Sequence, residues 1–141
     1  MERLQRNRWE EITLTLLRIG TGILFMQHGA QKLFGLLGGF GGEPGATAPL
    51  VSLMGLAGVL EFFGGALIVL GLLTRPVAFV LAVEMAIAYF YVHLPQDVWP
   101  IKNGGESAAL FALIFLYLTA RGGGPYSLDG IIGRRKRRGH I

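Results

Sequence analysis

Hydrophobic residues are gathered into four long runs, separated by short stretches rich in Gly, Pro and polar residues. The first two runs, 12–34 and 50–73, are each long enough to cross a hydrocarbon core of ~30 Å at about 1.5 Å per helical residue. The other two, 77–93 and 105–120, are at the short limit for such a span. The pattern predicts an all-α integral membrane protein with four transmembrane helices.

The composition favours lipid as the surrounding solvent. The chain has 141 residues, of which 52% are hydrophobic and 16% charged. A soluble domain of this size cannot bury so much apolar surface. There is no Cys, which excludes disulfides and thiolate metal sites. We expect no metal site, and we disfavour a haem held by His28 and His93, because a lone His near a membrane interface usually makes hydrogen bonds.

The distribution of Lys and Arg predicts the orientation. If the N-terminus lies inside, only Lys32 and Lys102 of the 13 basic residues lie outside. We therefore expect both termini in the cytoplasm and the protein in the inner membrane. The chain then divides into a basic N-terminal segment (1–11), a transmembrane domain (12–121) and a cytoplasmic C-terminal segment (122–141).

The C-terminal segment ends in a basic cluster, which both fixes the topology and is suited to contact with anionic lipids. Five basic residues on a membrane anchor do not indicate nucleic-acid binding. The cluster consists of Arg134, Arg135, Lys136, Arg137 and Arg138.

Each hydrophobic run carries one polar stripe at helical spacing, about 100° per residue. The stripes are Arg18–Gly22–Phe25–Gly29–Lys32 with His28 beside it, Met54–Gly58–Glu61–Gly65–Ile68, Val80–Glu84–Ala88–Tyr91, and Glu106–Leu110–Leu113–Tyr117. Ionisable groups at membrane depth usually face the interior of a bundle. Glycines in the second run allow close helix contacts. We therefore predict a four-helix bundle with all four stripes turned inward.

Two interpretations of this polar interior follow. An Arg18–Glu61 ion pair would fix the helix register and be purely structural. The presence of a second carboxyl, Glu84, instead suggests that one carboxyl is protonated or paired with Lys32 or His28. Such a group suits proton exchange with a bound ligand.

Several motifs resemble those of DoxX-type membrane proteins. The first helix contributes the pattern from Arg18 to Gly35, and the others are LEFFGGALIVLGLLTRP, AIAYFYVHLPQ, NGGESAALF and GGGPYSLDGII. The resemblance covers residues 12–132. It implies a four-helix inner-membrane protein, in a family named after a subunit of a thiosulfate:quinone oxidoreductase. The positions that match family motifs are Arg18, His28, Lys32, Glu61, Thr74, Arg75, His93, Glu106, Ser127 and Asp129. Glu84 is not among them and depends on the burial argument alone.

The resemblance favours a quinone-linked redox or oxidative-stress subunit. Lys32 and His28 would face Glu61 and Glu106 across a pocket suited to a quinone, and the pocket walls would be Phe25, Phe62 and Tyr91. If the chain is an enzyme, it is a subunit of a quinone-dependent oxidoreductase, because without Cys it needs a partner or cofactor to carry electrons.

An alternative is a non-catalytic anchor or assembly factor for a soluble oxidoreductase or sulfurtransferase. Its exposed parts, the segment 127–129 and the basic tail, would then carry the function. A small transporter or channel is disfavoured, since there is no inverted repeat and no broken helix. In each case we expect a homo- or hetero-oligomer.

Overall fold

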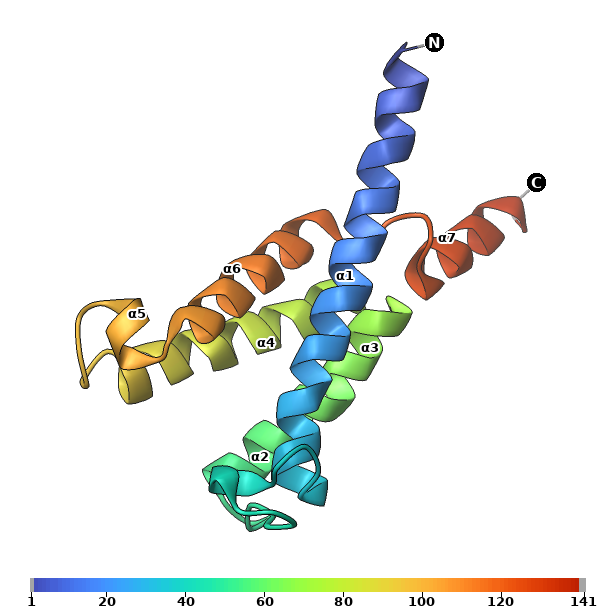
Figure 1. Cartoon of the computed structure of the whole chain (residues 1–141). Coiled ribbons are helices and arrows are strands. Elements are labelled where there is room, and N and C mark those ends of the chain that lie inside the picture. The colour runs from blue at the N-terminus through green and yellow to red at the C-terminus, as the bar shows by residue number, and fades with distance from the viewer. Residues whose placement is uncertain (1, 140–141) are drawn as a thin grey trace.

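The computed structural model describes residues 2–139, and this part of the chain is helical without strands (Figure 1). Its long elements are α1 (Glu2–Phe34), a continuous helix formed by α2 (Leu53–Val59), η2 (Leu60–Gly64) and α3 (Gly65–Leu70), a third helix formed by α4 (Thr74–Ile87) and η3 (Ala88–His93), and α6 (Glu106–Arg121). The short elements are η1 (Phe40–Gly42), α5 (Pro100–Asn103) and α7 (Leu128–Arg138). The four predicted runs are thus helical.

Two of the long helices, Leu53–Leu70 and Thr74–His93, are apolar and long enough to cross a membrane. α6 has 16 residues, fewer than the ~20 of a typical span. α1 is long enough but carries Arg18 and Lys32 within its apolar part. A bundle of four spanning helices with both termini inside therefore stays a prediction.

The helices associate in two pairs. α1 packs along the α2–η2–α3 helix, and α4 packs along α6. Figure 1 shows the α4–α6 pair diverging from the α1–α3 pair toward the α5 end. A Cβ on Gly22 would lie 2.6 Å from Cγ2 of Val69 and 2.8 Å from the carbonyl oxygen of Gly65. The first pair is therefore close because glycines face each other at the crossing.

A shared aromatic and aliphatic core joins the pairs. Phe25 of α1 is buried, and its ring centroid lies 4.8 Å from that of Phe115 and 5.1 Å from that of Phe111, both on α6. Ile68 and Leu81 belong to the same buried cluster. This core brings Phe25 of α1 against α6, while the rest of the α1 stripe packs on the second helix.

The predicted inward stripe is correct for α1 and for the second helix, where Arg18 and Glu61 are buried. On the third helix it is correct at Glu84, whose carboxyl oxygens are buried, but wrong at Val80 and at Tyr91, which is 80% exposed. It is wrong for the fourth helix, where Glu106 is exposed. Those helices bury Ala78, Leu81, Ala82, Met85, Ala108, Phe115 and Leu118 instead. Small and aliphatic side chains determine this contact.

Candidate functional site

An ion pair between α1 and η2 lies within the polar stripe. Nζ of Lys32, in the last turn of α1, donates a hydrogen bond to Oε2 of Glu61 at 2.6 Å. The Glu61 residue is only 4% exposed. The opposite charges of Lys32 and Glu61 compensate each other, because either charge alone would be costly to bury at this position.

A second carboxyl lies close to this pair. Glu84 of α4 interacts electrostatically with both Glu61 and Lys32. Both of its carboxyl oxygens are buried and have no hydrogen-bond partner in the described part of the chain. We call Lys32, Glu61 and Glu84 the polar centre. It contains two carboxyl groups and one ammonium group, so one ionised carboxylate would be left uncompensated.

The backbone at Glu61 is unusual. Residues 60–64 form the π-helical segment η2 in the middle of an otherwise α-helical rod. π-Helical turns inside α-helices occur frequently at functional sites. Sequence analysis did not predict this turn. Residues 60–64 read LEFFG, which contains no Pro and no motif typical of a π-helical turn.

Arg18 has a different role from the one predicted. Its Nη1 donates to the carbonyl oxygens of Ile68 at 2.8 Å and Val69 at 2.5 Å, and its Nη2 donates to that of Tyr126 at 2.9 Å. The Arg18–Glu61 pair is therefore wrong: Glu61 pairs with Lys32. The reason is the end of α3, where Gly71 turns left-handed at φ +67°. The Ile68 carbonyl still accepts from the N–H of Gly71, and Arg18 adds a second donor to it and supplies one to the carbonyl of Val69.

The other predicted site residues are dispersed. His28 is exposed, with its ring centroid 5.9 Å from that of Phe111. Phe62 packs against Phe34, with ring centroids 5.1 Å apart. The ring nitrogen Nδ1 of His93 lies 3.0 Å from the carbonyl oxygen of Asn103, the last residue of α5.

Phe25 belongs to the core, while Tyr91 and Glu106 point outward. The structure therefore brings together Lys32, Glu61 and Glu84 but does not assemble the full predicted set. Two cavities, of about 400 and 390 Å³, lie elsewhere, and neither is lined by His28 or by the polar centre.

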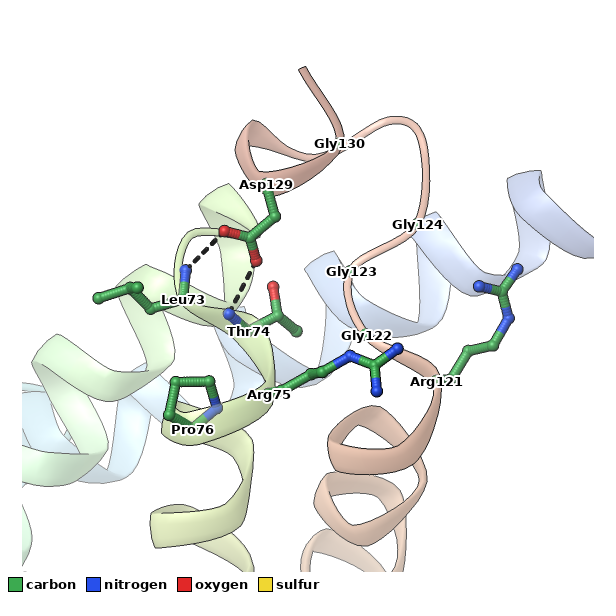
Figure 2. A pocket seen from close by; sticks show the side chains of 10 residues that line it. All are labelled: Leu73, Thr74, Arg75, Pro76, Arg121, Gly122, Gly123, Gly124, Asp129 and Gly130. Carbon is green, nitrogen blue, oxygen red and sulfur yellow. Dashed lines mark hydrogen bonds between the residues drawn. The ribbon is translucent and has the colours of Figure 1, made fainter. Parts of the chain in front are cut away.

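At the other end of the first helix pair, Asp129 caps α4 from a distance in sequence (Figure 2). Its Oδ1 accepts a hydrogen bond from the backbone N–H of Leu73, and its Oδ2 accepts one from that of Thr74, both at 2.9 Å. Partial burial raises the pKa of Asp129, but these hydrogen bonds and the charge of Arg18 outweigh it, so the pKa lies below its usual range.

The C-terminal motif serves this junction. Oγ of Ser127 donates to the carbonyl of Gly124 at 2.6 Å and accepts from the N–H of Gly130 at 3.1 Å, so Ser127 caps α7. Thr74 and Arg75, named by the resemblance without a place in space, lie beside it on α4. Sequence analysis did not predict that the loop of Gly122, Gly123 and Gly124 lies against Thr74 and Arg75. The only signal for this loop in the sequence is its run of three glycines.

A family model described as DoxX matches residues 13–94. The chain is 42% identical over 119 residues to an uncharacterized protein of Haemophilus influenzae, with 82% of this chain and 87% of that protein covered. It is 32% identical over 140 residues to a Bacillus subtilis protein named "Putative oxidoreductase CatD", with 96% and 98% covered. No solved structure matches.

Proposed function

The chain belongs to the DoxX family of membrane proteins, and we propose that it is a subunit of a quinone-linked redox or oxidative-stress complex. The observation that carries this proposal is Glu84, whose two buried carboxyl oxygens have no hydrogen-bond partner in the described chain. Unsatisfied polar groups in a dry environment are costly and often mark a functional site.

In this proposal the polar centre binds and protonates one carbonyl end of a quinone. Reduction of a quinone to a quinol consumes two electrons and two protons. A partner oxidoreductase supplies the electrons. Glu84 donates one proton to one quinone oxygen and is then reprotonated from water, which also supplies the second proton to the other oxygen. The Lys32–Glu61 pair keeps its compensating charges in place. The π-helical turn at Glu61 supports a local role for this backbone beyond packing.

We further propose that all four long helices span the inner membrane, with both termini in the cytoplasm. The apolar surface of the chain then contacts lipid. In this arrangement α7 lies on the inner surface, where its exposed basic residues meet anionic headgroups. These residues are Arg134, Arg135, Lys136, Arg137 and Arg138.

The test is quinone binding by the purified protein in nanodiscs, followed by quenching of tryptophan fluorescence with a short-chain ubiquinone. We expect saturable binding that Glu84→Gln weakens about tenfold, since it replaces the carboxylic-acid donor with a weaker amide donor. Glu106→Gln is the matched control, because it makes the same chemical change at an exposed position. Equal affinity of the Glu84→Gln and wild-type proteins would reject the proposed role of Glu84.

A second function, a non-catalytic anchor or assembly factor for a soluble oxidoreductase, is favoured by a different observation. Arg18 and Asp129 both hold helix ends together, and α7 projects from the helices with its basic residues exposed (Figure 1). An anchor predicts that a partner co-purifies in stoichiometric amount with the Glu84→Gln protein. It also predicts no quinone binding by the wild-type protein.

A further inference from the structure

The larger cavity, about 400 Å³, shares no residue with the polar centre. It lies where the start of α4, the end of α6 and the start of α7 meet (Figure 2). We call it the Arg75 cavity. It is lined by Leu73, Thr74, Arg75, Pro76, Arg121, Gly122, Gly123, Gly124, Asp129 and Gly130.

Arg75 brings a guanidinium without an ion-pair partner in the described chain to this cavity. Figure 2 shows its side chain extending along the glycine loop, and a Cβ on Gly122 would lie 3.1 Å from its Nε. No hydrogen bond or ion pair engages its guanidinium within the described chain. The neighbouring Arg121, in contrast, pairs through Nη2 with Oε1 of Glu11 at 2.5 Å.

Asp129, the carboxylate that lines the cavity, makes no ion pair with Arg75 in the described chain, although its negative charge stays at the cavity wall. Both oxygens of Asp129 accept hydrogen bonds from backbone N–H groups, those of Leu73 and Thr74. Asp129 therefore serves the first turn of α4, and those two N–H groups are no longer available to a ligand.

Thr74 places a hydroxyl donor at the same cavity. The residue is 0% exposed, and its Oγ1 makes no hydrogen bond of standard geometry in the described chain. In Figure 2 the hydroxyl lies beside the Asp129 carboxylate, whose pKa the Thr74 side chain helps to lower. A Cβ on Gly123 would lie 2.7 Å from this oxygen, so only glycine lets the loop approach it so closely.

We propose that the Arg75 cavity binds a phosphate-type oxyanion, with the Arg75 guanidinium and the Thr74 hydroxyl as donors. A guanidinium and a hydroxyl are a suitable donor set for such an anion. The anion comes either from a lipid headgroup or from free phosphate, since both present the same oxygens.

The experiment uses the full chain in nanodiscs and two probes. Inorganic phosphate is titrated calorimetrically into protein in phosphatidylcholine nanodiscs. Separately, the melting temperature is measured in phosphate-free buffer, with and without phosphatidic acid in the nanodisc. Arg75→Gln should weaken phosphate binding at least about tenfold, or abolish the lipid-induced increase in melting temperature. Lys102→Gln is the matched control, because it makes an equal charge change at an exposed position on α5.

Thr74→Val keeps the proposal testable if Arg75→Gln fails to fold. Valine has the same shape and removes a hydroxyl that makes no hydrogen bond of standard geometry in the described chain, so the protein should be no less stable while its affinity for the anion falls. Phosphate binding that depends on Arg75 identifies a free oxyanion, and an Arg75-dependent effect of phosphatidic acid alone identifies a headgroup. The proposal is overturned if neither probe acts through Arg75 and Thr74, or if Lys102→Gln has the same effect as Arg75→Gln.

Discussion

Replacing Arg18 with methionine removes the guanidinium that ties α1 to the end of α3 but keeps a long side chain. Arg18 is 1% exposed and donates to three carbonyl oxygens, those of Ile68, Val69 and Tyr126. Each buried acceptor left without a donor costs about 1–3 kcal/mol. The Ile68 carbonyl keeps the N–H of Gly71 as a donor, so two carbonyls, those of Val69 and Tyr126, lose theirs. Since a helix end can relax, we expect a loss near the lower part of this sum, about 2–4 kcal/mol in the free energy of unfolding.

The assay is equilibrium unfolding in mixed micelles of lipid and sodium dodecyl sulfate, followed by circular dichroism. Lys102→Met is the control, because an exposed substitution should change the free energy of unfolding by no more than about 0.5 kcal/mol. A loss below about 1 kcal/mol for Arg18→Met would show that these two carbonyls find other donors.

A double-mutant cycle then tests which groups are coupled. Arg18→Met and Glu61→Gln should be additive within about 0.5 kcal/mol, because Glu61 pairs with Lys32 and not with Arg18. Lys32→Met and Glu61→Gln should couple by about 1 kcal/mol or more, since they share one buried ion pair. Strong coupling between Arg18 and Glu61 would refute the pairing described above.

Two further predictions concern helix packing and pH. Gly22→Ala should destabilise the protein by about 1–3 kcal/mol, because its Cβ would collide with Val69 and Gly65; Gly20→Ala, with nothing within 4 Å, should be neutral or stabilising in the same unfolding assay. Asp129→Asn should cost about 1 kcal/mol at pH 7. Because the folded pKa of Asp129 is lowered, its stabilisation is present above its usual pKa and is lost as the pH falls through the folded value. Unfolding measured from pH 7 downward should show the difference from Asp129→Asn shrinking in that acid range; a constant difference would contradict the cap.

The helical ranges were predictable because hydrophobic runs and their Gly and Pro boundaries are local features. The second helix was expected at 50–73 and the structure places it at Leu53–Leu70. The start of α1 was less predictable. It begins at Glu2 rather than near residue 12, because its charged first turns consist mostly of good helix formers, which hydropathy does not count.

The buried face of each helix was predictable only where glycines and charges shared it. This was so on α1 and on the second helix, where Gly22 and Gly65 meet. On α4 and α6 alanines and aliphatic residues such as Ala78 and Leu118 make the contact. Glu84 of α4 turns toward the polar centre, whereas Glu106 of α6 points outward. A polar stripe is therefore a weaker guide to a helix interface than the positions of small side chains.

The sequence by itself determined that the chain is helical, suited to lipid, and rich in charged groups at membrane depth. Only the tertiary structure decided that Lys32 reaches Glu61, that Arg18 serves the end of α3, and that Asp129 caps α4. The physical reason is that the rise per residue fixes a group's height along its own helix. It does not fix the offset or rotation of a neighbouring helix, and a long Lys or Arg side chain can reach any of several partners within that freedom.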